Sequence, residues 1–378
     1  MGDYSTWENW IAKITGDLKS SRRWRQLYPI SRNQMNSPVI FASNDYLGLT
    51  SHPIVKKSAI SAIEKYGSGS GASRLVTGTL DIHIELEKRL AEWKGSQSAL
   101  VFSSGYSANV GVISALGGDD AFIVSDELNH ASLIDGCRLS RTNFGVAKHC
   151  DLGDYERLLG ENREKRLIVV TDSVFSMDGD IAPLEELAKL CAGFGALLIV
   201  DEAHAVMGPY FNLDSEGKYF GAKIARIGTF SKTLGSLGGF VATTSEICDL
   251  LVNRARSFIF STALSPGDAG GALGGLSVIQ SEEGETLLGN LRKNVEVVAP
   301  YLGLKSNHPS PILPLIVGEE SLAIEASKFF LNRGLLITAI RPPTVAPMTS
   351  RLRIALSAIH TSREIELLCL AIEEWLDR

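Results

Sequence analysis

The chain has 378 residues, of which 44% are hydrophobic and 21% charged, a composition that is typical of folded globular proteins and excludes an intrinsically disordered chain. Its formal net charge is -6 at pH 7 and its charges are interspersed, so we expect no nucleic-acid partner. Five scattered cysteines without a C-x-x-C pair, and a start without a long apolar run, predict a cytoplasmic protein with no membrane association.

The N-terminal segment predicts an amphipathic helix that ends before Pro29. Apolar side chains recur near one face of this helix, at Trp7, Trp10, Ile11, Ile14 and Leu18. We expect residues 1–43 to pack as a helical arm.

From Ser98 onward, short apolar runs alternate with helical patterns. The runs are ALVFSS, AFIVS, RLIVVTDS, ALLIVDE, ARIGTF and GGFVATT, and helices are expected to begin at Tyr106, Ala131 and Pro183. Continuous apolar strands separated by helices predict a mostly parallel sheet that is buried on both faces. The predicted fold class is therefore α/β, with a large domain over residues 44–284 that forms a three-layer sandwich.

After about Glu285 the pattern changes. A long helix is followed by the run PILPLIV, a helix over 321–333, the runs LLITAI and RLRIALS, and a final helix. This order predicts a smaller α+β domain over residues 285–378. The sequence contains no low-complexity linker, so we expect the domains to pack closely.

Loops between these elements carry polar or glycine-rich sequences. They are GSGSGAS, FSSGYS, DELNHAS, VFSMDGD, DEAH and TFSKTLGSLGG. Residues just beyond the carboxyl ends of parallel strands converge on one crevice. We therefore expect several of these loops to build a single site at that edge of the sheet.

Three residues in these loops suggest a cofactor site. Lys232 lies between hydroxyl residues and glycines, where the backbone can approach a planar ring. Asp201 ends the run LLIVD, where a buried carboxylate needs a cation, and His204 follows three residues later. A lysine amine and a carboxylate for a pyridine nitrogen are what pyridoxal 5'-phosphate (PLP) requires. The alternatives are a solvated surface lysine and an aspartate that caps a helix.

FSSGYSAN lies at a strand-to-helix turn, where the N–H groups of Gly105 and Tyr106 can bind a phosphate. A plain tight turn is the alternative. His130 in DELNHAS can stack on an aromatic ring or have a structural role only. Ser107 in GYSAN raises the alternative of a serine hydrolase, although Asn109 replaces the second glycine of G-x-S-x-G.

Two further classes are excluded by spacing. Asp201 and His204 cluster, but no H-E-x-x-H spacing accompanies them, so we expect no metal. DEAH also occurs in helicases, yet the G-x-x-x-x-G-K-[ST] phosphate loop that a helicase needs is missing from the sequence.

These motifs, from SNDYLGL at 43–49 to RLRIALSAIHT at 351–361, resemble the α-oxoamine synthase family of fold-type I PLP enzymes. The resemblance implies a decarboxylative condensation of an amino acid with an acyl thioester. PLIVG and ITAIRPPTVAP are similar to the member of biotin biosynthesis that joins L-alanine to a pimeloyl thioester, carried by CoA or acyl carrier protein. A glycine-using sister activity and a non-catalytic PLP-binding protein are the alternatives.

The resemblance also implies roles for individual residues. It implies that PLP is bound covalently by Lys232 and that catalysis involves Lys232, His130, Asp201 and His204. It gives further cofactor contacts to Gly105, Tyr106, Ser176 and Thr229, and to Ser261 and Thr262 across the interface of a homodimer. Substrate contacts are implied for Arg25, Asn44, His130, Arg341 and Thr344. The chain departs from the family after His204, where it reads HAVMGPYFNLDSEGKYF. The family usually has glycine at the position of Ala205 and a glycine-rich loop beyond it.

Overall fold

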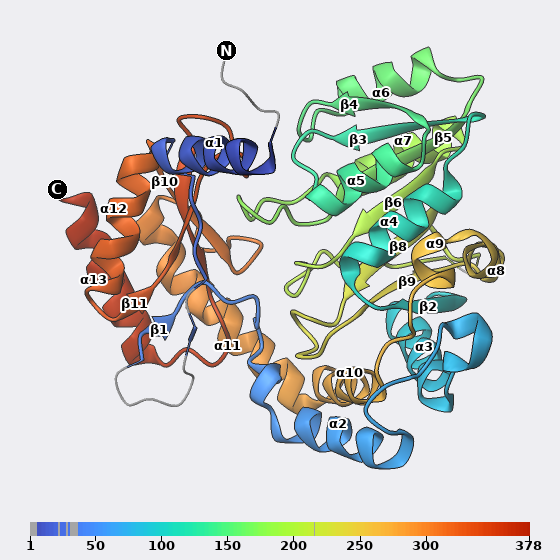
Figure 1. Ribbon diagram of the computed structural model, residues 1–378, viewed down its shortest axis with the longest axis horizontal. Coiled ribbons are helices and arrows are strands. Elements are labelled where there is room, and N and C mark those ends of the chain that lie inside the picture. The colour runs from blue at the N-terminus through green and yellow to red at the C-terminus, as the bar shows by residue number, and fades with distance from the viewer. Residues whose placement is uncertain (1–5, 22, 28, 31–36, 215) are drawn as a thin grey trace.

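The structure of the protein is a computed structural model, which describes residues 6–21, 23–27, 29–30, 37–214 and 216–378. Figure 1 shows two lobes, a large one built around a long sheet and a smaller one that combines N-terminal and C-terminal segments. Among the described residues, no helix has both the length and the apolar character needed to cross a bilayer.

The large lobe contains an eight-stranded sheet in the order β2-β9-β8-β6-β5-β3-β4, with the short β7 paired to β8. The strands are β2 (Ser98–Phe102), β3 (Ala121–Asp126), β4 (Asn143–Ala147), β5 (Arg166–Asp172), β6 (Leu197–Asp201), β7 (Lys218–Tyr219), β8 (Ala222–Thr229) and β9 (Gly239–Thr243). The strands β4, β3, β5, β6 and β8 are parallel, whereas β9 is antiparallel to both of its neighbours. The predicted mostly parallel sheet is confirmed.

Helices cover both faces of this sheet. They are α2 (Pro53–Tyr66), α3 (Asp81–Lys94), α4 (Gly105–Leu116), α5 (Ala131–Leu139), α6 (Leu152–Glu161), α7 (Leu184–Phe194), α8 (Ser245–Arg254), α9 (Arg256–Ile259) and α10 (Pro266–Ile279). Successive strand residues point to opposite faces, so Val170 of β5 packs with α4 and α5, whereas Val169 packs with α6 and α7. This arrangement makes the three-layer sandwich.

The small lobe holds an antiparallel sheet in the order β10-β13-β12. Its elements are β10 (Ile312–Gly318), β12 (Thr338–Ile340), β13 (Ser350–Ala355), α11 (Glu282–Val298), α12 (Glu320–Leu331) and α13 (Ser362–Leu376). β1 (Val39–Ile40) pairs in parallel with β11 (Leu335–Leu336), so the N-terminal segment contributes to this lobe. The short helical turns are η1 (Leu49–Ser51), η2 (Arg74–Gly78) and η3 (Ala299–Leu302).

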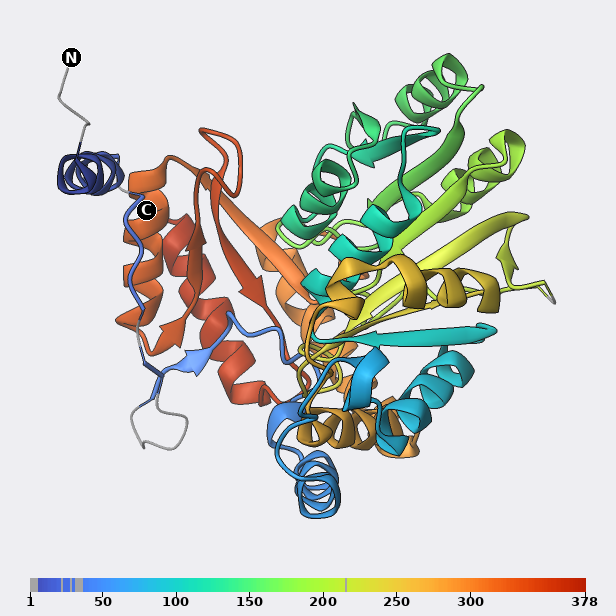
Figure 2. The ribbon, with the colours of Figure 1, turned by 45° about the vertical axis from the view of Figure 1, so that its right-hand side comes forward.

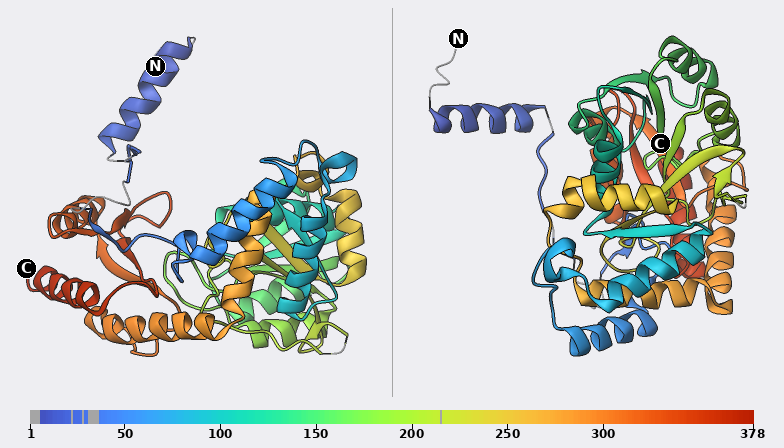
Figure 3. Two further views of the ribbon diagram at one scale, coloured as in Figure 1. Left: turned by 90° about the horizontal axis from the view of Figure 1, so that it is seen from below. Right: turned by 90° about the vertical axis from the view of Figure 1, so that its right-hand side faces the viewer.

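The predicted N-terminal helix is α1 (Trp7–Ser20), which begins after the cap residue Thr6 and ends well before Pro29. Figures 2 and 3 show it projecting away from both lobes. None of its residues is buried, and Trp7 is 74% exposed. The helix is therefore confirmed, and its apolar side chains are exposed in the single chain.

Candidate active site

A cavity of about 240 Å³ lies where the carboxyl ends of β5, β6 and β8 meet the N-termini of α4 and α5. It brings together many of the residues predicted for the cofactor: Gly105, Tyr106, His130, Asp201, His204, Thr229 and Lys232. Their convergence follows from the parallel strands, because the loops beyond the carboxyl ends share one edge of the sheet.

Lys232 lies in the segment that connects β8 to β9, with its side chain half-buried in the cavity wall. Burial lowers the pKa of Lys232, and the charge of Arg353 lowers it further, although Asp201 and Asp172 oppose the shift. The amine therefore loses its proton more easily than a surface lysine does. The alternative of a solvated surface lysine is wrong.

Asp201 and Asp172 end the neighbouring strands β6 and β5 and lie side by side in register. Asp201 accepts hydrogen bonds from Asn109 Nδ2 at 2.7 Å and from the Ala203 N–H at 2.8 Å. Burial raises the pKa of Asp172 well above its ordinary value, and the charge of Asp201 raises it further. Two buried carboxylates thus face one lysine amine, so the cavity suits a ligand that brings a positive charge.

His204 is buried and belongs to a network that reaches the small lobe. Its Nδ1 lies 2.6 Å from the hydroxyl of Tyr46. Burial lowers the pKa of His204 well below its ordinary value, and the charges of Lys232 and Arg353 act in the same direction. The imidazole is therefore neutral at pH 7.

Arg353 of β13 joins the predicted residues Asn44 and Ser176 to this network. Its Nη2 donates to Asn44 Oδ1 at 3.1 Å and to Tyr46 Oη at 3.3 Å, and its Nε donates to the carbonyl oxygen of Ser176. Arg353 is only 7% exposed, and its charge acts on both Lys232 and His204. A buried cation therefore lies at the side of the cavity that faces the small lobe.

His130 caps the N-terminus of α5 and is accessible to the cavity. Its backbone N–H donates to Asp172 Oδ2 at 2.7 Å, and its Nδ1 lies 2.7 Å from Ser132 Oγ. Burial by the surrounding atoms lowers the pKa of His130, while Asp201 opposes this shift. The structural contacts fix the ring at the cavity, so the structural and the cofactor-facing interpretations of His130 are compatible.

Gly105 and Tyr106 begin α4, whose first N–H groups have no acceptor within the helix. A Cβ atom at Gly105 would lie 3.0 Å from Thr229 Cβ, so glycine permits the close approach of α4 to the end of β8. Thr229 Oγ1 lies 2.8 Å from Ser231 Oγ. Backbone N–H groups and two hydroxyls therefore form a cradle that suits a phosphate.

The serine hydrolase alternative is wrong. Ser107 Oγ donates to the carbonyl oxygen of Ser104 at 2.8 Å and accepts the Ser104 N–H at 2.9 Å. Within the described parts of the chain, no histidine forms a hydrogen bond with it. Its hydroxyl belongs to the cap of α4.

The remaining predicted residues do not line this cavity in the single chain. Ser261 is half-buried and Thr262 is exposed. Arg25 Nη2 donates to Thr344 Oγ1 at 3.2 Å, and both residues are exposed. The half-buried Arg341 accepts a hydrogen bond from the Thr344 N–H through its carbonyl oxygen at 3.1 Å.

Three residues of the site are not predicted from the sequence. Asn109 stands there only as a mismatch to a hydrolase motif. Asp172 ends an apolar run in the same way as Asp201, and this strand-end position was the available signal. Arg353 alternates with apolar residues in RLRIALS, and a buried charge on a strand usually has a specific partner.

His149 links two of the loops that carry site residues. Its Nδ1 and Nε2 lie 2.8 Å from Asp126 Oδ1 and 2.7 Å from Asp180 Oδ2. Hydrogen bonds to these carboxylates and to Cys150 raise the pKa of His149 to about 12. Ligand atoms of Asp126, His149 and Cys150 lie within 4.8 Å of one another, but an imidazolium has no lone pair for a metal. The absence of a metal stays a prediction.

The sequence of this chain matches the family model described as aminotransferase class I and II over residues 36–372. The chain belongs to this family. An 8-amino-7-oxononanoate synthase of Geobacter sulfurreducens is 45% identical over 371 residues, which cover 93% of this chain and 95% of that protein. The resemblance to the α-oxoamine synthases is therefore confirmed.

Solved structures of the family agree with the fold. A serine palmitoyltransferase of Sphingomonas wittichii has a TM-score of 0.86 and 28% identity, with 99% of this chain and 98% of that chain covered. An 8-amino-7-oxononanoate synthase of Francisella tularensis has a TM-score of 0.74 and 27% identity, with 90% and 98% covered. The predicted fold-type I architecture is confirmed.

Proposed function

We propose that the protein is a PLP-dependent acyltransferase with 8-amino-7-oxononanoate synthase activity, which condenses L-alanine with a pimeloyl thioester and releases carbon dioxide and a free thiol. The observation that carries this proposal is the position of Lys232 opposite the paired strand-end carboxylates of Asp201 and Asp172. The curated relative of Geobacter sulfurreducens, at 45% identity, supplies the specific reaction.

The residues of the cavity fit PLP in charge and in hydrogen bonding. Asp201 would bind the protonated ring nitrogen, the α4 N-terminus and Thr229 would hold the phosphate, and His130 would contact the ring. Solved serine palmitoyltransferases of the same fold contain PLP. When bound, PLP withdraws electrons from the α-carbon of an amino acid attached to it.

The other steps depend on side chains of this chain. The Nζ of Lys232, whose pKa is lowered by burial, would accept the α-proton of alanine. The guanidinium of Arg353 would bind the alanine carboxylate, because it is a buried cation close enough to act on Lys232 and His204. His204, held by Tyr46, would keep a neutral imidazole beside the cofactor. The remaining predicted substrate contacts, Arg25, Asn44, Arg341 and Thr344, stay part of the proposal.

The proposed active enzyme is a homodimer. Ser73 and Thr262 form an isolated antiparallel β-bridge that joins two segments of the chain. Apolar side chains of both segments are strongly exposed, with Val76 at 74% and Phe260 at 70%. Burying this surface against a second copy would be favourable, and it would place Ser261 and Thr262 at an interface.

The division into a helical arm over residues 1–43, a large domain over 44–284 and a small domain over 285–378 remains a proposal. The cytoplasmic location stays a prediction.

The test is the fate of the carbon atoms of alanine. With PLP-loaded protein and pimeloyl-CoA, L-alanine labelled with ¹³C in the carboxyl group should release labelled carbon dioxide. Alanine labelled in the methyl group should give 8-amino-7-oxononanoate that keeps the label, as read by mass spectrometry. A product that retains the carboxyl label, or no product with an acyl-CoA or acyl carrier protein donor, contradicts the proposal.

Serine palmitoyltransferase activity is the second candidate, because those structures have the higher TM-score. Their identity is 27–28%, against 45% for the 8-amino-7-oxononanoate synthase of Geobacter sulfurreducens. L-Serine with palmitoyl-CoA is therefore the appropriate parallel reaction, and we expect no product from it.

A further inference from the structure

A second cavity, of about 270 Å³, lies beside the active site. Both cavities are lined by Ala203, Gly228 and Thr229, so the ends of β6 and β8 separate them. The segment after His204, which departs from the family pattern, forms one wall through Pro209, Tyr210 and Phe211.

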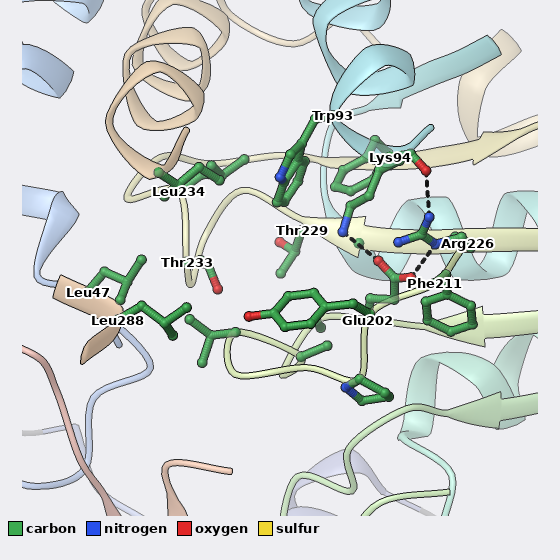
Figure 4. Close-up of a pocket in the computed structure, with 18 of the residues that line it drawn as sticks. Leu47, Trp93, Lys94, Glu202, Phe211, Arg226, Thr229, Thr233, Leu234 and Leu288 are labelled. Carbon is green, nitrogen blue, oxygen red and sulfur yellow. Dashed lines mark hydrogen bonds and ion pairs between the residues drawn. The ribbon is translucent and has the colours of Figure 1, made fainter. Parts of the chain in front are cut away.

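One end of this cavity holds three buried charges, shown in Figure 4. Glu202 accepts hydrogen bonds from Lys94 Nζ at 2.5 Å and from Arg226 Nε, and Arg226 Nη1 donates to the Lys94 carbonyl oxygen at 2.7 Å. The exposed fractions of the Lys94, Glu202 and Arg226 side chains are 12%, 2% and 6%. Two cations therefore share one carboxylate.

Both cations also lie over aromatic rings of the cavity: Lys94 Nζ is 3.9 Å from the centroid of the Trp93 ring, and the Arg226 guanidinium is 4.5 Å from that of Phe211. The group still holds one more formal positive charge than the carboxylate of Glu202 balances. Glu202 is the only acidic side chain among the described residues that line it. Burial lowers the pKa of Lys94, and Arg226 lowers it further, while Glu202 opposes the shift; an anion bound beside Lys94 would favour its charged form. An ammonium and a guanidinium also carry more N–H donors than these contacts use. An anion in the cavity would compensate the surplus positive charge and accept the remaining donors.

The opposite end of the cavity is apolar. Figure 4 shows Leu47, Leu234 and Leu288 facing the charged group across the cavity, and Trp93 and Phe240 line its side. Apolar surface of this kind binds a hydrocarbon group but offers no partner to a second charge. The two ends thus suit a molecule with one anionic end and one apolar end.

We propose that this cavity is a binding site for a small monocarboxylate with an apolar body, separate from the catalytic cavity. The carboxylate lies against Lys94 and Arg226, and the hydrocarbon chain lies among Leu47, Leu234 and Leu288. Thr229 and Thr233, which flank Lys232 on either side, line the same cavity. A bound carboxylate therefore contacts the segment that positions the catalytic lysine.

Isothermal titration of the PLP-loaded protein with hexanoate tests this proposal. The neutral isostere hexanamide and the short acid acetate are the matched ligands. We expect hexanoate to bind at least about tenfold more tightly than either, because hexanamide lacks the charge and acetate lacks the apolar body. Equal affinity for hexanoate and hexanamide, or no binding of hexanoate at about 10 mM, overturns the proposal.

Two variants assign the binding to this cavity. Lys94→Met removes the surplus charge and leaves Glu202 paired with Arg226, so the variant keeps no unpaired buried charge. Leu288→Trp fills the apolar end without changing charge. Each is expected to weaken hexanoate binding at least about tenfold, whereas Lys189→Met on the surface leaves it unchanged. Unchanged binding in both cavity variants places hexanoate elsewhere and contradicts the proposal.

Discussion

Replacing Asp201 with asparagine (Asp201→Asn) tests the charge arrangement of the active site. The two side chains have nearly the same shape, so the amide oxygen of the variant can still accept the Ala203 N–H that Asp201 accepts at 2.8 Å. The substitution removes one of the two carboxylates that face Lys232. It also replaces the oxygen that accepts the hydrogen bond from Asn109 Nδ2 by an amide nitrogen, so the variant tests the charge of Asp201 together with this hydrogen bond.

The expected magnitude follows from the loss of a charged hydrogen bond. Such a bond to a cationic ring nitrogen contributes about 1.5–3 kcal/mol, so PLP should bind roughly 10- to 150-fold more weakly. Asp201 also raises the pKa of both Lys232 and Asp172. Both pKa values should therefore fall in the variant, and turnover should fall even at saturating PLP.

The assay is titration of the PLP-free protein with PLP, followed by absorbance, together with thiol release at saturating PLP. Asp119→Asn, at an exposed position, is the matched control and should behave as wild type. Wild-type PLP affinity and wild-type turnover in the Asp201 variant would refute the assignment of Asp201 to the ring nitrogen.

Three further changes test other parts of the site. Lys232→Ala should abolish covalent retention of PLP on a desalting column and nearly all turnover, and substantial turnover would contradict its role. Arg353→Met should raise the KM for L-alanine by about tenfold or more while the KM for the acyl donor changes little, as steady-state kinetics can show. His149→Gln should lower stability by about 1–3 kcal/mol. Because the pKa of His149 is raised to about 12 in the folded protein, its contribution is complete below its ordinary pKa of about 6.5 and declines as the pH rises towards 12. Urea unfolding at about pH 6 and about pH 9 should therefore show the larger deficit at the lower pH, and a deficit that grows with pH would contradict the ion pairs.

The parts of the fold that follow from local pattern could be predicted from the sequence. Apolar runs such as LLIVD became the buried strand β6, and the strand-end position of Asp201 placed it in the cavity. Lys232 and His130 joined it because the loops of parallel strands converge. The edge strand β4 was missed, since Asn143 and Phe144 are exposed and its sequence lacks a continuous apolar run.

Contacts between distant segments could not be predicted. Arg353 reaches Asn44 from 309 residues away along the chain, and the pairing of Lys94 with Glu202 spans 108 residues. Neither contact has a local periodicity. The resemblance to a family supplied Asn44 and Ser176, but only the structure shows that Arg353 connects them.

The two cavities at this edge of the sheet differ in the charged groups that line them. Asp201 and Asp172 lie beside Lys232 in the catalytic cavity, whereas Lys94 and Arg226 share the carboxylate of Glu202 in the neighbouring cavity. Asp201 and Glu202 are adjacent in the sequence, yet Asp201 lines the catalytic cavity and Glu202 lines the neighbouring one. They separate because successive residues at the end of a strand point in opposite directions.

The central claim is tested most directly by thiol release from the PLP-loaded protein. The reactions to compare are L-alanine with pimeloyl-CoA, glycine with succinyl-CoA, and glycine with acetyl-CoA. The proposed function predicts rapid release only in the mixture of alanine and pimeloyl-CoA. Release in a glycine mixture would assign the protein to a sister activity, and no release in any mixture, with the carrier-protein donor also inactive, would contradict the proposed reaction.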